Sequence, residues 1–260
     1  MGLAEFFGCS LVAFGPSLSM FCVTIAACPI RVIIFITAAF FWLVSLLFSS
    51  IVWCSVLEIF RIRTSEEKSN FVVFGLLVAV AFQELFRYLF YGILRRADNG
   101  LKKMVEVGST GSVVSDSRQL LAYVAGLGFG TMSGGFSLLN VLAEIGGPAS
   151  VGYGGQSEWF VLVSSVTTSL FVILNTCWGV ILFHGYDTRD HRLIIGAIAS
   201  HFVCSLMTLF NKNETYVASL LPISVMTVVC AGLAFHLAGG KYRKLHLMFK
   251  SRTSSVSSSQ

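Results

Sequence analysis

Charged residues are scarce in this chain. Only 12% of its 260 residues are charged, whereas 55% are hydrophobic. A soluble globular domain carries roughly 25% charged residues. The composition therefore argues against a soluble enzyme. The net charge of +5 does not indicate a nucleic-acid partner, because the basic residues lie in the loops and the tail, as membrane topology would place them.

Sequence signatures of catalysis and metal binding are also missing. The chain has no His-Glu-x-x-His motif, no Gly-x-Ser-x-Gly motif and no Cys-x-x-Cys pair. No aspartate lies within a predicted span, which excludes an intramembrane aspartyl dyad. A cluster of His184, Asp187, Asp190 and His191 could bind a metal, but we favour a solvated cytosolic loop. We therefore predict a protein that is not an enzyme and that holds no metal and no cofactor.

Apolar residues occur instead in seven blocks, each about as long as the 20 residues that a helix needs to cross the hydrocarbon core. The predicted spans are Phe6–Ala27, Val32–Val56, Phe71–Leu94, Leu120–Ala143, Trp159–Phe183, Leu193–Phe210 and Tyr216–Gly239. In lipid, backbone polar groups must pair within the segment, so blocks of this length predict helices. We expect an all-α membrane protein with one seven-helix domain over residues 1–240. A flexible, basic and serine-rich tail follows at residues 241–260 and is expected to contact membrane lipids.

The positions of arginine and lysine predict the orientation. Thirteen basic residues lie in the first, third and fifth loops and the tail, against four in the other loops. By the positive-inside rule the C-terminus is cytosolic, and seven crossings then put the N-terminus on the lumenal or extracellular side. The triplet Asn213-Glu214-Thr215 lies on that side, so Asn213 is a candidate glycosylation site.

A row of glycines marks the fourth span. Gly126, Gly130 and Gly134 are four residues apart and therefore lie along one helix face. Such a row lets a second helix backbone approach closely, where hydrophobicity alone provides no drive for association within lipid. The sequence leaves two partners open, either another helix of this chain or a helix of a different protein.

Four polar side chains lie within the predicted spans. Glu84 and Arg87 are three residues apart on one helix, so they can neutralise each other, and we favour this interpretation over an ion pathway. Asn175 and His201 are expected to make structural hydrogen bonds between the fifth and sixth helices, because a buried polar group needs a partner. Titration of His201 is the alternative.

Several strings together carry a family resemblance. They are Glu5-Phe6-Phe7-Gly8-Cys9, Ala13-Phe14-Gly15-Pro16, Pro29-Ile30-Arg31-Val32-Ile33-Ile34, Phe40-Phe41-Trp42-Leu43-Val44-Ser45-Leu46-Leu47, Gln83-Glu84-Leu85-Phe86-Arg87, Ala122-Tyr123-Val124, Gly126-Leu127-Gly128-Phe129-Gly130 and Ser219-Leu220-Leu221-Pro222-Ile223. The series resembles the Aph (anterior pharynx-defective) subunit of γ-secretase over residues 1 to about 240.

The resemblance implies a non-catalytic scaffold subunit of an intramembrane aspartyl protease complex. Such a subunit would assemble with nicastrin, presenilin and the Pen subunit in the endoplasmic reticulum, Golgi, plasma membrane and endosomes. Presenilin would supply the catalytic aspartates. The family's glycine row matches Gly126, Gly130 and Gly134, and one of its two intramembrane histidines matches His201. Asn175 stands where the family usually has the other histidine.

The competing interpretation is a small-solute membrane transporter or channel. That class predicts internal repeats with paired broken helices near the membrane midplane. The chain shows no such repeat, and only Pro16 and Pro222 fall within predicted spans. A rhodopsin-like receptor would share the seven-span topology, but no receptor motif is present.

Overall fold

The computed structural model describes residues 3–62, 64–106, 118–145, 159–213 and 215–240, and every regular element in them is helical. In chain order the elements are α1 (Leu3–Thr24), α2 (Pro29–Ile59), α3 (Ser65–Glu106), α4 (Arg118–Ile145), α5 (Phe160–Thr188), α6 (His191–Met207), the 3₁₀ helix η1 (Thr208–Asn213) and α7 (Tyr216–Leu237). The predicted tail lies outside the described residues.

The predicted all-α membrane fold is confirmed. Among the described residues, six helices are long and apolar enough to cross a membrane. The remaining helix, α4, occupies the position of the predicted fourth span but is less apolar, because glycine, serine and threonine fill its middle. The chain is therefore an integral membrane protein. Its orientation across the membrane remains a prediction.

The helices run further than the apolar blocks that predicted them. α3 continues from Leu94, where the predicted span ended, to Glu106, because arginine, lysine and glutamate are good helix formers once the chain has left the apolar layer. α5 ends at Thr188, and α6 begins at His191 after Asp190 caps it by accepting a hydrogen bond from a backbone N–H. The predicted loop between them was too long.

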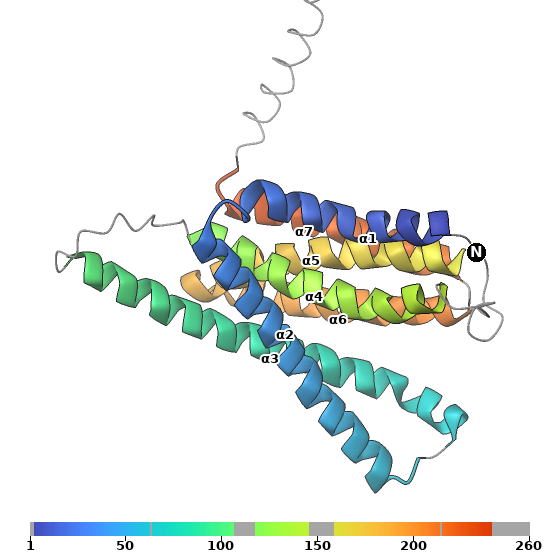
Figure 1. The fold of residues 1–260 in the computed structure, drawn as a ribbon. Coiled ribbons are helices and arrows are strands. Elements are labelled where there is room, and N and C mark those ends of the chain that lie inside the picture. Colours follow the sequence, from blue (N-terminus) through green and yellow to red (C-terminus); the bar gives the residue numbers. More distant parts are fainter. Residues whose placement is uncertain (1–2, 63, 107–117, 146–158, 214, 241–260) are drawn as a thin grey trace, which may run out of the picture.

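α5 is the central helix of the bundle. α1, α4, α6 and α7 all pack against it, and its contact with α4 is the most extensive between helices of the described chain (Figure 1). In the most apolar stretch of α5, 67% of the residues are buried, against 17% to 28% in the other five candidate spans. Residues on α5 therefore contact this chain's own helices, whereas most of the other spans expose apolar surface.

α2 and α3 are arranged differently from the other five helices. They pack against each other, while α2 also contacts α4 and α3 also contacts α6. Both cross the bundle obliquely, and the ends that are joined at Ile59 and Ser65 lie apart from the remaining helices (Figure 1). The hairpin of α2 and α3 is therefore attached to the bundle along only part of its length.

Candidate functional site

The glycine row on α4 faces α5 of the same chain. A Cβ added at Gly126 would lie 2.8 Å from the carbonyl oxygen of Thr176, and one added at Gly130 would lie 2.6 Å from that of Val172. At Gly134 the added Cβ would meet Cγ2 of Val172 at 2.8 Å. Real Cβ atoms do not approach so closely, so only glycine permits this separation of the two helices. The sequence left open whether the row contacts another helix of this chain or a different protein. In the structure it contacts a helix of this chain.

Two further glycines make close backbone contacts, one between α4 and α5 and the other between α4 and α2. A Cβ at Gly179 on α5 would lie 2.7 Å from the Cα of Gly126, so the two backbones meet glycine to glycine. On another face of α4, a Cβ at Gly128 would clash with the carbonyl of Phe35 on α2. Gly135 has no atom within 4 Å of an added Cβ and thus lies outside the contact. Sequence reasoning missed Gly179 and Gly128, although the two-residue spacing of Gly126, Gly128 and Gly130 signals glycine on more than one face.

The four predicted intramembrane polar residues form one buried cluster. Arg87 Nη1 lies 3.0 Å from Glu84 Oε1, and Arg87 Nη2 donates to Asn175 Oδ1 at 2.5 Å. His201 Nδ1 lies 2.5 Å from the same Oε1 of Glu84. The guanidinium of Arg87 is 5.3 Å from the ring centroid of Phe129 on α4. Glu84, the most exposed of the four, has only 6% of its surface accessible.

This cluster joins helices that are far apart in the chain. Glu84 and Arg87 come from α3, Asn175 from α5 and His201 from α6. The opposite charges of Glu84 and Arg87 cancel, so burying the pair costs less than burying either charge alone. Asn175 and His201 make the expected structural hydrogen bonds, but the predicted pairing of the fifth with the sixth helix is wrong, because their partners Arg87 and Glu84 both lie on α3. The side chain of α5 that touches His201 is Trp178, and that contact is a ring stack.

A second polar contact between α3 and α5 lies further along both helices. Asp187 accepts from Tyr91 Oη at 2.9 Å and from Arg95 Nε and Nη2 at 2.9 and 2.6 Å. Arg118 lies 3.9 Å from both Asp187 and Asp98. Sequence reasoning missed this contact, because the predicted third and fifth spans stopped before Arg95 and Asp187. Asp98 and Asp187 both lie within candidate spans of the structure, Phe71–Gly100 and Phe160–Thr188, so the expectation that no aspartate lies within a span is corrected.

The predicted loop around residues 184–191 is replaced by helix. His184 and Asp187 belong to α5, and His191 begins α6. Asp187 is engaged by Arg95, and Asp190 caps α6, so both carboxylates already have donors. Across the described part of the chain, no three His, Cys, Asp or Glu residues are grouped so that they could hold a metal ion.

A polar cavity of about 390 Å³ adjoins the buried cluster. It lies between α3, α4, α5, α6 and η1, and its polar lining includes Gln83, Ser137, Thr167, Thr168, His201 and Ser205. The described lining residues are hydroxyl, amide, imidazole and apolar groups without a carboxylate. These groups can donate and accept hydrogen bonds, but they do not include the pair of carboxylic acids that hydrolysis by an aspartyl dyad requires.

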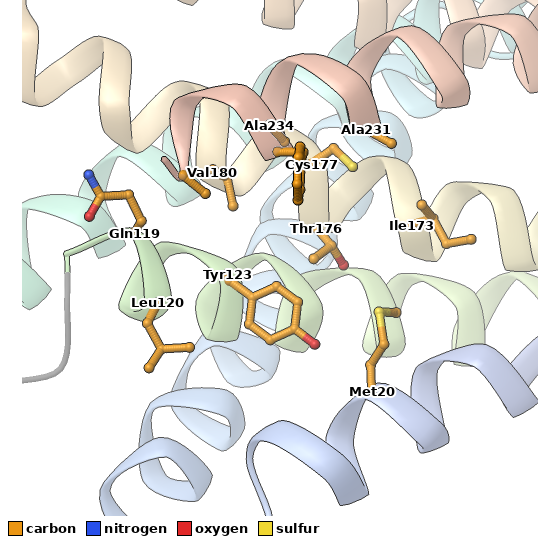
Figure 2. Close-up of a pocket in the computed structure, with 12 residues that line it drawn as sticks. Met20, Gln119, Leu120, Tyr123, Ile173, Thr176, Cys177, Val180, Ala231 and Ala234 are labelled. Carbon is orange, nitrogen blue, oxygen red and sulfur yellow. The ribbon is translucent and has the colours of Figure 1, made fainter. Parts of the chain in front are cut away.

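A second cavity, of about 410 Å³, is almost entirely apolar. Figure 2 shows Tyr123 of α4 and Met20 of α1 facing Thr176 and Cys177 of α5, with Ala231 of α7 on the far side. The hydroxyl of Tyr123 is within 3.1 Å of that of Thr24 on α1. The cavity lies beside the α4–α5 contact and offers few groups for chemistry.

Asn213 is the last residue of η1. Its side chain and the following Glu214 lie outside the described residues, so glycosylation at Asn213 remains a prediction.

Comparison with known proteins gives consistent matches over nearly the whole chain. A family model described as Aph-1 protein matches residues 4–241. The γ-secretase subunit Aph-1 of Drosophila melanogaster is 43% identical over 243 residues, which cover 94% of this chain and 96% of the relative. The γ-secretase subunit APH-1B of Homo sapiens is 38% identical over 247 residues, 95% of this chain and 93% of the relative. The γ-secretase subunit Aph-1b of Danio rerio is 39% identical with the same coverage.

Proposed function

Because the chain belongs to the Aph-1 protein family, we propose that it is a non-catalytic scaffold subunit of a γ-secretase complex. In this role it assembles with nicastrin, presenilin and the Pen subunit and stabilises them in the membranes of the secretory and endosomal system. Its C-terminus lies in the cytosol and its N-terminus on the opposite side.

The glycine-mediated contact between α4 and α5 is the main support for a scaffold. It lets two backbones meet without intervening side chains, so dispersion contacts are dense where lipid provides no hydrophobic drive. A bundle built around α5 in this way keeps its outer helices in fixed positions. A fixed outer surface is what a subunit needs if other membrane proteins are to assemble on it.

The non-catalytic role is supported by the partners of two acids within the helices, the buried Glu84 and the partly buried Asp187. Glu84 is shared by Arg87 and His201, and Asp187 is held by Arg95 and Tyr91. A catalytic dyad instead needs two carboxylates that share a proton at an open site. We therefore assign proteolysis to the presenilin partner and structural support to this chain.

The transporter or channel alternative has little support. The relatives named above are all named as γ-secretase subunits. The charged pair in α3 is neutralised and tied to α5 and α6, which suits a structural anchor better than a relay for ions.

The direct test is purification of the tagged full-length chain from membranes in a mild detergent, followed by identification of the proteins that co-purify. We expect nicastrin, presenilin and the Pen subunit, with an unrelated multi-span protein carrying the same tag as the control. Failure to recover these subunits from membranes that contain them would contradict the assembly role. Intramembrane proteolysis by the chain purified without them would contradict the non-catalytic role.

A further inference from the structure

The described structure places Trp178 directly against His201. We propose that Trp178 is the positioning residue for His201, so that the imidazole donates its Nδ1–H to Glu84 and keeps Nε2 as an acceptor. This assignment rests on the proposed scaffold role, because the contacts of His201 with Trp178 and Glu84 hold α3, α5 and α6 in fixed relative positions.

The tautomer follows from the chemistry of Glu84. A carboxylate can only accept hydrogen bonds, and Oε1 of Glu84 is 3.0 Å from the guanidinium of Arg87, which keeps that carboxylate charged. His201 Nδ1, 2.5 Å from the same oxygen, must therefore carry a proton. Because Glu84 and Arg87 already cancel, a neutral ring leaves the buried cluster without net charge, whereas an imidazolium would add an uncompensated one beside Arg87. A neutral imidazole has one donor nitrogen, so Nε2 is the acceptor.

Trp178 determines the plane of the imidazole. The two ring centroids are 4.2 Å apart and the planes differ by 26°, so the indole covers one face of the imidazole. The indole is itself held, since Nε1–H donates to Ser200 Oγ at 2.8 Å and Ser200 donates in turn to the carbonyl of Ala197 at 2.8 Å. The χ2 torsion of histidine is intrinsically broad. The stack restricts it, and Glu84 then selects which edge of the ring turns toward α3.

The arrangement links three helices through one side chain. Trp178 is fully buried on α5, His201 lies on α6, and Glu84 lies on α3. His201 also lines the polar cavity, and Nε2 is the ring nitrogen that does not bind Glu84. If the ring turned over about χ2, the carbon Cδ2 would take the place of Nδ1, and α6 would then lose its hydrogen bond to α3.

The spectroscopic test uses the full-length chain labelled with ¹⁵N-histidine, because ring ¹⁵N shifts distinguish the two neutral tautomers and the imidazolium. The His201→Gln spectrum identifies the His201 signals by their absence. We expect the Nδ1–H tautomer in the wild type. In Trp178→Leu this tautomer should be lost or should mix with the Nε2–H form, whereas Trp178→Phe, which keeps an aromatic ring, should retain most of the Nδ1–H population. Trp159→Leu is the control, since Trp159 is 65% exposed.

Several results would overturn the assignment. They are an Nε2–H or imidazolium form in the wild type, and an unchanged Nδ1–H signal in Trp178→Leu. If that variant does not accumulate, Trp178→Met decides in the same way, because the flexible methionine side chain adapts to an irregular space without providing a ring plane. The readout comes from the chain itself, whereas failure of the scaffold role appears as missing subunits in the purification, so the two failures are distinguishable.

A substitution series at His201 gives an independent check. The amide nitrogen of asparagine is two bonds from Cβ, as Nδ1 is, whereas that of glutamine is three bonds away, as Nε2 is. His201→Asn should therefore keep the bond to Glu84 and preserve more folded protein than His201→Gln. A glutamine variant equal to or better than the asparagine variant would overturn the Nδ1 assignment.

Discussion

The packing of α4 against α5 can be tested with one methyl group. Gly130→Ala and Gly135→Ala make the same chemical change five residues apart in one helix. At Gly130 the new Cβ would lie 2.6 Å from the carbonyl oxygen of Val172 and 3.1 Å from Cβ of Asn175. At Gly135 nothing lies within 4 Å of it. The pair therefore separates the effect of the close contact from that of the substitution itself.

The structure allows the size of the effect to be estimated. Non-bonded carbon atoms prefer separations of about 3.5–4.0 Å, so the two helices must move apart by roughly 1 Å at Gly130. Overpacking of this kind typically costs about 1–3 kcal/mol. Alanine gains roughly 1 kcal/mol of helix propensity at both positions, and this gain cancels in the comparison. Gly130→Ala should therefore be less stable than Gly135→Ala by about 1–3 kcal/mol.

Thermal stability of a fluorescent fusion in one detergent is the suitable assay. One kcal/mol shifts the melting temperature by about 2–4 °C in a domain of 150–250 residues, so the two variants should differ by several degrees. Gly130→Leu should amplify the loss and, if the proposed scaffold role holds, also reduce the co-purified subunits, because displacement of α4 shifts the outer surface of the bundle. Gly135→Leu should leave both quantities near the wild type.

Two results would refute this reasoning. Equal melting temperatures for Gly130→Ala and Gly135→Ala would show that the helices separate at no cost. A lower melting temperature for Gly135→Ala would show that the tight face of α4 is not the one that carries Gly130.

The other predictions concern the orientation of the chain and its two polar contacts. A tag placed after residues 241–260 should be cleaved by protease added to the cytosolic side of sealed microsomes, and a protected tag would contradict the orientation. Replacing Glu84 or Arg87 alone should cost about 3–5 kcal/mol by leaving a buried charge unpaired. Exchanging the two should restore only part of the folded protein, since their other polar partners must reverse roles; strictly additive losses would argue against the pair. Asp187→Asn should lower the melting temperature because Arg95 loses a bidentate partner, and Arg95→Met combined with Asp187→Leu should recover part of the loss; an unchanged melting temperature in Asp187→Asn would contradict this contact.

The membrane-spanning helices could be predicted from the sequence because they depend on properties of each segment alone. The length and apolarity of each block decide whether a segment can cross a membrane, and the need to pair backbone groups within the segment then requires a helix. Helix ends were less accurate. Apolarity ends at the membrane surface, whereas a helix ends where its backbone hydrogen bonds end, so α3 extends beyond Leu94 to Glu106. The second polar contact, at Arg95, was missed for this reason.

The sequence by itself determined that this is a helical membrane protein, that the α4 glycines favour close packing, and that the buried polar groups require partners. Only the tertiary structure decided which partners they have. Arg87 reaches Asn175 across 88 residues of chain, and His201 reaches Glu84 across 117. Spacing along one helix shows which side chains share a face, but not which helix lies opposite. That choice depends on how α1, α4, α6 and α7 pack around α5 and how the hairpin of α2 and α3 attaches to them, which is a property of the whole fold.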